Sequence, residues 1–144
     1  MKVKIYRIDK SLPLPEYKTE GAVAMDLSAR IDLEIKPKQT GFVPLNIAVQ
    51  APRGWFVFLA ARSGLAKRGL MMVNGVGLID EDYSGDGDEL TAFLYNFTDA
   101  PVLIKKGERL LQLMVFPYGR VEWREVETLN NPNRGGFGST GRYS

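Results

Sequence analysis

Hydrophobic and polar side chains alternate along several short stretches of the chain, and this pattern predicts strands. Residues 2–7 alternate in this way, and residues 30–36 place Ile31, Leu33 and Ile35 on one face. A period of two is typical of a β-strand with one buried face. On the same pattern, or on their β-rich composition, further strands are expected at residues 42–49, 55–60, 90–97, 110–116 and 121–126.

Only one stretch favours a helix. Ser63 can cap it, residues 65–67 favour helix, and Gly69 can end it. Many short strands with almost no helix are typical of an all-β barrel or a jelly-roll-like fold. We therefore expect one all-β domain over residues 1–129, with a single short helix from Ser63 to Arg68.

The most informative stretch is residues 73–85, Val-Asn-Gly-Val-Gly-Leu-Ile-Asp-Glu-Asp-Tyr-Ser-Gly. Asn74 and the glycines punctuate a short apolar pattern, which predicts a hairpin. Asp80 directly follows the apolar pair 78–79, and partial desolvation of its carboxylate would suit a general base. Tyr83 follows in the same loop, where its ring could form one wall of a small pocket. The alternative is an Asp- and Gly-rich turn with solvated carboxylates.

The C-terminal stretch, residues 130–144, has a different composition. It is rich in Asn, Gly and Ser and has almost nothing to bury, so we expect a mobile arm. The arm carries Arg134 and the ring of Phe137 among glycines. Such an arm suits closure over a ligand, and a plain disordered terminus is the alternative.

Two residue types are absent from the chain, and their absence narrows the chemistry. The 144 residues include no Cys and no His. Disulfides, thiol nucleophiles, the usual zinc ligands and histidine bases are therefore excluded. In an enzyme of this composition we expect a carboxylate as the base and a hard, oxygen-bound metal ion such as Mg²⁺.

Charge and hydropathy argue against two kinds of partner. The net charge is only +2, which gives no electrostatic case for binding to nucleic acid or to a membrane. The N-terminus lacks the apolar region of a signal peptide, and no apolar run has membrane-spanning length. We expect a soluble, cytoplasmic protein.

Two features are candidates for phosphate binding. Arg62, Ser63 and Gly64 stand at the start of the predicted helix, where backbone N–H groups and a guanidinium favour an anion. The alternative is an ordinary capped helix. Gln112 interrupts the apolar run 110–116, and an unsatisfied buried amide costs about 1–3 kcal/mol. Its side chain therefore either points outward or reaches a ligand.

Together, these stretches resemble the homotrimeric dUTP pyrophosphatases (dUTPases). The five short motifs of that family are matched in order by residues 14–29, 62–66, 74–85, 107–113 and 134–141. The resemblance implies a distorted jelly-roll or β-clip barrel that forms a homotrimer with shared active sites. It also implies hydrolysis of dUTP to dUMP and pyrophosphate, which keeps uracil out of DNA and supplies dUMP for dTMP synthesis.

The resemblance also implies roles for individual residues. Asp80 would activate water for attack on the α-phosphorus, and Tyr83 would pack against the deoxyribose. Mg²⁺ would be held mainly by the triphosphate, and Asp26 would reach its water shell. From the arm, Phe137 would stack on the uracil and Arg134 would bind the γ-phosphate. The other implied substrate-binding residues are Arg62, Ser63, Gly64, Asn74, Gly77, Leu78, Ile79, Thr91, Gln112, Gly136 and Gly138.

The chain departs from the family pattern at several positions. Ala24-Met25 replaces the usual Gly-Tyr, Ala61 replaces Pro, and Ser84 replaces Arg. Residues 86–88, Asp-Gly-Asp, form an apparent insertion that bears on the implied role of Thr91. Two alternatives to a dUTPase stay open. One is a dCTP deaminase, or a bifunctional deaminase that makes dUMP, from a family that shares the fold. The other is a non-enzymatic protein that uses its nucleotide state to control a partner.

Overall fold

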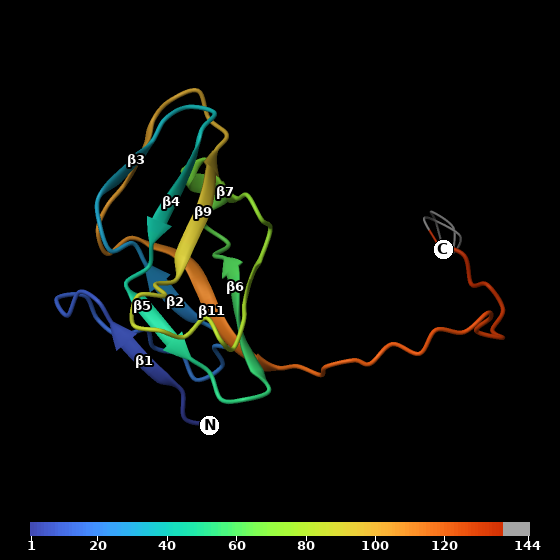
Figure 1. The fold of residues 1–144 in the computed structure, drawn as a ribbon. Coiled ribbons are helices and arrows are strands. Elements are labelled where there is room, and N and C mark those ends of the chain that lie inside the picture. The colour runs from blue at the N-terminus through green and yellow to red at the C-terminus, as the bar shows by residue number, and fades with distance from the viewer. Residues whose placement is uncertain (137–144) are drawn as a thin grey trace.

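The computed structural model describes residues 1–136, and these residues form an almost entirely β structure. They build eleven strands in four antiparallel sheets and one short 3-10 helix (Figure 1). This architecture confirms the all-β prediction. Within the described residues, no helix is both long and apolar enough to cross a membrane.

The largest sheet has β11 near its centre. β11 is its longest strand, and it pairs with β2 on one side and with β6 on the other. A register shift between Arg109 and Leu111 bends β11 at its start. The strands lie in the order β2 (Met25–Ser28), β11 (Arg109–Pro117), β6 (Trp55–Ala61) and β8 (Gly77–Ile79).

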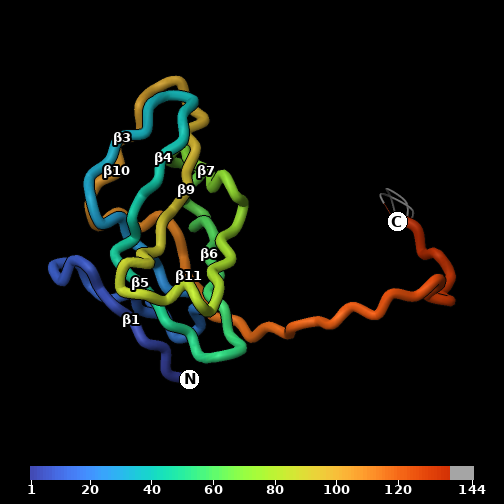
Figure 2. Tube along the Cα trace, in the orientation of Figure 1, coloured from blue at the N-terminus to red at the C-terminus, as the bar shows by residue number. Residues whose placement is uncertain are grey.

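The other sheets are smaller and lie around the same core, as the traces in Figure 2 show. Inward-facing side chains such as Leu59, Leu94 and Leu111 are fully buried and supply the core. The three-stranded sheet has the order β4 (Thr40–Pro44), β9 (Thr91–Asn96) and β7 (Leu70–Met72). The two-stranded sheets pair β1 (Lys4–Arg7) with β5 (Ile47–Gln50), and β3 (Leu33–Ile35) with β10 (Val102–Ile104).

The helix prediction was wrong in its start and type. The observed element is η1, a 3-10 helix at Ala66–Arg68, with Leu65 at its N-cap position and no side-chain cap. In the connection between β6 and β7, Lys67 N–H donates to the Gly64 carbonyl at 3.1 Å and Arg68 N–H to the Leu65 carbonyl at 3.0 Å, which is the three-residue spacing of a 3-10 helix. The predicted end is confirmed, because Gly69 adopts the left-handed conformation with φ 76°.

The predicted hairpin at residues 73–85 was also wrong. The stretch contains one strand, β8, which pairs with β6, whereas the preceding strand β7 pairs with β9 in another sheet. The turn at Asn74 and Gly75 therefore passes the chain from one sheet to the next. Alternation predicts that strands exist, but it does not predict which distant strands they pair with.

The predicted strand at residues 42–49 is split into β4 and β5. Asn46 lies between them with φ 71°, and its side chain accepts a hydrogen bond from Asp9 N–H at 2.7 Å. This bond to a distant residue stabilises a break that the apolar pattern hides, and Asn tolerates the left-handed region better than most residues.

The chain leaves the body after β11. The predicted strand at residues 121–126 does not form, and residues 118–136 run outward without a strand or helix (Figure 1). Val121, Leu129 and Trp123 are exposed, and Trp123 is 90% exposed. Within residues 1–136, no strand pairs with residues 119–136, and all of these residues are exposed. The predicted division between a domain at 1–129 and an arm at 130–144 stays a prediction.

Candidate active site

Several of the predicted phosphate-binding residues meet at one end of the large sheet. Asp26 on β2 lies opposite Gln112 on β11, and Gln112 in turn lies opposite Ala60 on β6. Arg62 directly follows β6. The order of the strands thus brings together three residues that are far apart in the sequence.

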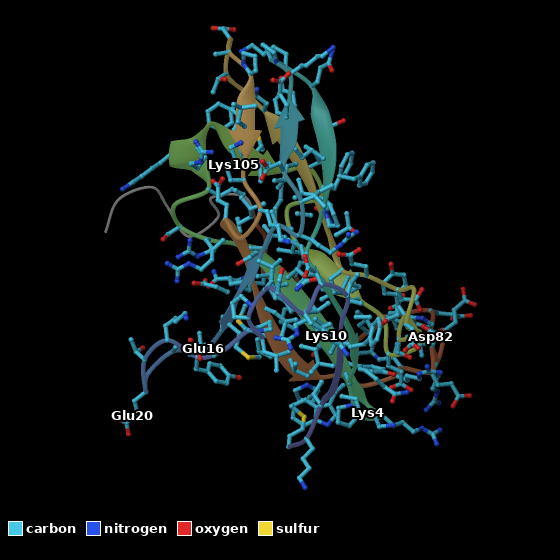
Figure 3. All side chains as sticks on the ribbon, turned by 90° about the vertical axis from the view of Figure 1, so that its left-hand side faces the viewer. Lys4, Lys10, Glu16, Glu20, Asp82 and Lys105 are labelled. Carbon is cyan, nitrogen blue, oxygen red and sulfur yellow. The ribbon has the colours of Figure 1, made fainter. Side chains whose placement is uncertain are left out.

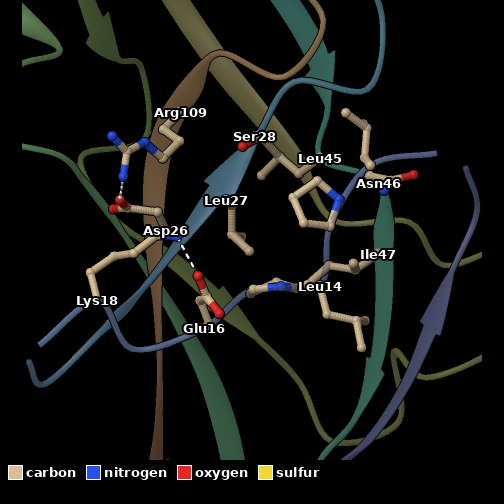
Figure 4. A pocket seen from close by; sticks show the side chains of 13 residues that line it. Leu14, Glu16, Lys18, Asp26, Leu27, Ser28, Leu45, Asn46, Ile47 and Arg109 are labelled. Carbon is tan, nitrogen blue, oxygen red and sulfur yellow. Dashed lines mark hydrogen bonds and ion pairs between the residues drawn. The ribbon is translucent and has the colours of Figure 1, made fainter. Parts of the chain in front are cut away.

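Two arginines hold the carboxylate of Asp26. Arg62 Nε lies 2.7 Å from Asp26 Oδ1, and Arg109 Nη1 lies 3.0 Å from Oδ2. Figure 4 shows Arg109 reaching toward Asp26 across the edge of the sheet. Two guanidinium groups and one carboxylate leave a net charge of +1, which suits an anion such as a phosphate. The sequence reasoning missed Arg109, whose only signal was its place in the segment 107–113.

The polar groups beside this ion-pair cluster are also positioned. Gln112 is half-buried, and its Nε2 donates to the Ala61 carbonyl at 3.0 Å, which offsets the cost of placing an amide in an apolar strand. Ser63 is exposed and Gly64 half-buried in the turn that follows Arg62. Their roles toward a ligand stay predictions.

The candidate base lies in a loop at the other end of the same sheet. Asp80 directly follows β8, and Tyr83 N–H donates to the Asp80 carbonyl at 3.2 Å, which closes a turn. Asp80, Leu78 and Phe56 line a hollow with Tyr118. Asp80 is exposed in the single chain, so the predicted partial desolvation was wrong for the chain on its own.

The other predicted residues near Asp80 are distributed around β8. Gly77 packs closely, since an added Cβ would lie 3.0 Å from Leu59 Cβ. Ile79 packs against the core, whereas Leu78 points outward and is 63% exposed. Asn74 is exposed in the turn before the strand. This part of the site therefore stands open, with an apolar side chain facing outward.

Tyr83 and Thr91 share one anchor. The Tyr83 hydroxyl donates to the Glu89 carbonyl at 3.3 Å, and Thr91 Oγ1 donates to the same oxygen at 3.2 Å. Glu89 in turn holds Arg30 through two contacts of 2.8 and 2.9 Å. This anchor fixes Thr91 at the start of β9 despite the insertion before it.

The insertion at residues 86–88 closes on itself. Gly85 N–H donates to Asp88 Oδ2 at 2.7 Å, and Asp88 N–H donates to the Gly85 carbonyl at 3.0 Å. The polar groups of Gly85 and Asp88 therefore bond to each other within the loop. Charged side chains of both signs, such as Lys4 and Glu20, are exposed on other parts of the chain (Figure 3).

An aromatic patch separates the two ends of the sheet. Phe58 lies edge-on to Phe116 at 5.8 Å, and Phe56 lies 6.1 Å from Phe116. Ile79 pairs with Val57, while Gln112 pairs with Ala60. Asp80 directly follows Ile79, and Arg62 lies five residues beyond Val57, so the two are offset by roughly 17 Å along β6 at about 3.3 Å per residue. One chain therefore does not bring Asp80 onto the cluster around Arg62.

The last predicted residues lie on the arm. Arg134 and Gly136 are exposed in the outgoing segment. Phe137 and Gly138 lie outside the described residues. Within residues 1–136, no group of three Asp or Glu side chains gathers in a way that could hold a metal ion. Asp26 shares its pocket with the carboxylate of Glu16, and its role toward Mg²⁺ stays a prediction.

Solved structures with the same fold define the class of the protein. A dUTPase from Streptococcus mutans matches with a TM-score of 0.75 and 28% identity, over 83% of this chain and 98% of that chain. A dUTPase of Staphylococcus bacteriophage 80alpha with dUpNHpp matches with a TM-score of 0.84 over 97% and 98% of the two chains. At 22% identity, the second match supports the fold alone. The class is that of small all-β hydrolases.

Sequence relatives define the family more closely. The profile of the dUTPase family matches residues 10–141. A deoxyuridine 5′-triphosphate nucleotidohydrolase from Dictyoglomus turgidum is 45% identical over 98% of this chain and 99% of its own length. The corresponding protein from Anaplasma marginale is 39% identical over the same shares. The chain belongs to the dUTPase family.

Proposed function

We propose that this protein hydrolyses dUTP to dUMP and pyrophosphate. The observation that carries the proposal is the 45% identity, over nearly the whole chain, to a deoxyuridine 5′-triphosphate nucleotidohydrolase. The sheet that displays Asp80 at one end also displays the cationic cluster of Arg62 and Arg109 at the other. In the cell, this activity keeps uracil out of DNA and supplies dUMP for dTMP synthesis.

Asp80 acts as the general base. Its carboxylate orients a water molecule and takes its proton as the water attacks the α-phosphorus. Hydrolysis of a phosphoanhydride requires an in-line water and neutralised charge, and it does not require a covalent nucleophile. A chain without Cys or His supplies both requirements through one carboxylate and its arginines.

The active site is shared between the subunits of a homotrimer. Three features support this arrangement: the distance between Asp80 and Arg62 within one chain, the aromatic patch between them, and the exposure of Leu78. In a closed ring of copies, the end of one sheet that carries Asp80 meets the end of the next that carries Arg62. The neighbouring copy then covers Asp80 and provides the desolvation that the single chain lacks.

Substrate selection belongs to the residues around β8. Backbone groups near Asn74, Leu78 and Thr91 read the uracil edge, and a wrong base leaves a polar group unpaired, which costs about 1–3 kcal/mol. Gly77 allows the close packing that holds β8, and the Tyr83 ring packs on the deoxyribose and excludes a 2′-hydroxyl. The anchor at Glu89 supports this role, because it fixes Tyr83 and Thr91 together.

The phosphates lie at the cationic cluster and under the arm. Arg62, Ser63, Gly64 and Gln112 bind them from the body. Arg134 binds the γ-phosphate, and Phe137 covers the uracil. Asp26 would reach the water shell of a Mg²⁺ ion held mainly by the triphosphate, and the bound ion would supply charge neutralisation.

One experiment separates this function from its alternatives. The purified protein is incubated with Mg²⁺ and, in separate reactions, with dUTP, dCTP, dTTP or UTP, and the products are identified by chromatography. We expect dUMP and pyrophosphate from dUTP alone. Ammonia released from dCTP would instead indicate a deaminase. Binding of nucleotide with no turnover would indicate a non-enzymatic binding protein and refute the proposal.

A further inference from the structure

The carboxylate of Glu81 joins three separate segments of the chain. Its Oε2 accepts a hydrogen bond from Gly54 N–H at 2.8 Å and another from the Tyr118 hydroxyl at 2.7 Å. Tyr118 N–H donates in turn to the Gly54 carbonyl at 3.0 Å. The three residues thus form a closed ring of hydrogen bonds, which we name the clip.

The three members of the clip lie beside the candidate base, before β6 and directly after β11. Glu81 is the neighbour of Asp80 in the turn closed by Tyr83. Gly54 lies in the turn before β6 with φ 80°, a conformation that favours glycine. Tyr118 directly follows β11, and within residues 1–136 it is the last residue whose backbone hydrogen-bonds to the body.

The charge of Glu81 and the packing of the Tyr118 ring both favour the hydrogen bonds of the clip. The hydrogen bond from Gly54, followed by that from Tyr118, lowers the pKa of Glu81 below its usual range, so the acceptor is ionised at neutral pH. Hydrogen bonds to an ionised acceptor are shorter and stronger than those between neutral groups. The Tyr118 ring meets Phe56 edge-on at 6.4 Å, which fixes the direction of the hydroxyl.

The clip connects two parts of the site. One is the loop of Asp80, and the other is the segment that leaves the body after β11, whose Arg120 lines the same hollow as Asp80 and Glu81. We propose that Glu81 and Tyr118 are positioning residues that hold the first residue of the outgoing arm against the Asp80 loop. The proposal deepens the proposed function, because it rests on the roles given there to Asp80 and the arm.

A double-mutant cycle tests this coupling. Tyr118→Phe removes the hydroxyl and keeps the ring on Phe56, and it is made both in the full chain and in a chain that ends at Asn130. In the full chain, we expect kcat for dUTP to fall about tenfold, the scale of one lost hydrogen bond to a charged group. In the shortened chain, we expect a change of less than about twofold, because the clip has no arm left to position.

The controls separate positioning from folding. Tyr95→Phe makes the same chemical change on β9, outside the clip, and should leave kcat unchanged. Thermal unfolding of each variant shows whether the fold is kept. An equal fall of kcat in both chain lengths would overturn the coupling, because Tyr118 would then act without the arm. An unchanged kcat in the full chain would overturn it as well.

A second readout does not depend on catalysis. With Trp55→Phe, the fluorescence anisotropy of the protein reports Trp123 alone, which is exposed on the segment after Tyr118. Adding Tyr118→Phe should lower this anisotropy, because the root of the arm is released. If the wild-type protein failed to hydrolyse dUTP while this drop was seen, the proposed function would fail and the clip would stand. An unchanged anisotropy would overturn the clip.

Discussion

Replacing Asp80 by Asn tests whether the loop after β8 carries the base. The Asp80 side chain is exposed, and the bond that closes its turn uses its backbone carbonyl, which accepts from Tyr83 N–H at 3.2 Å. An amide of the same shape keeps that bond, so the free energy of unfolding should change by less than about 0.5 kcal/mol. The turnover number should fall by about 10² to 10⁴, the usual contribution of a positioned general base.

The assay for Asp80→Asn measures pyrophosphate release at saturating dUTP and Mg²⁺, beside thermal unfolding and nucleotide binding. Asp82→Asn is the matched control, since Asp82 lines the same hollow and its loss changes the charge equally. We expect the control to keep near wild-type turnover. Turnover of Asp80→Asn within tenfold of wild type would refute the assignment of the base, and so would equal losses in the two variants.

Three further changes test the C-terminal arm, the turn at Gly69 and the ionised carboxylate of Glu81. Removing residues 131–144 should cut turnover heavily and leave the thermal unfolding temperature unchanged, whereas an active shortened chain would exclude the covering role of the arm. Gly69→Ala should lower the free energy of unfolding by about 1–3 kcal/mol, since Gly69 has φ 76° and an added Cβ would lie 2.2 Å from Thr98 Cγ2. Urea unfolding measures this change. Gly21→Ala is the control and should leave stability unchanged, because nothing lies within 4 Å of the added Cβ. The pKa of Glu81 is lowered in the folded state, so its stabilisation is complete above the unfolded value of about 4.3 and is lost as pH falls through the folded value. The stability difference between wild type and Glu81→Gln should therefore shrink as the pH is lowered below about 4.3, and a constant difference in urea unfolding would contradict this.

Of the three alternating stretches, residues 2–7 and 30–36 contain β1 and β3, whereas residues 121–126 form no strand. The stretches predicted from their β-rich or apolar composition were located more closely. Residues 90–97 and 110–116 became β9 and β11 with small changes at their ends. The three-residue strands β7 and β10 were missed, since so short a run carries no visible period. The split at Asn46 depends on a hydrogen bond to distant Asp9, and no local pattern encodes that bond.

In the candidate site, too, the sequence predicted residues with a local signal and missed residues whose partners are distant in the chain. Arg62 and Gln112 were chosen from their local sequence and Asp26 through the resemblance. The cross-strand register explains why the three lie together. Arg109 and Glu81 were missed because their partners lie far away in the sequence. A residue whose role is to hold another residue leaves little trace in its own neighbourhood of the chain.

The places where local reasoning failed are not scattered at random. Asp80 is exposed where desolvation was expected, Leu78 faces outward, and the alternating stretch 121–126 has no strand to pair with in its own chain. Two of these features lie on the outer face of the large sheet and the third on the segment that leaves it. Each describes a residue that lacks a neighbour in one chain. Since apolar area and strand-forming pattern both favour burial, the economical explanation is a second copy that supplies the missing neighbours. The same copy would bring a cluster of arginines to Asp80, so the packing argument and the catalytic argument require one and the same assembly.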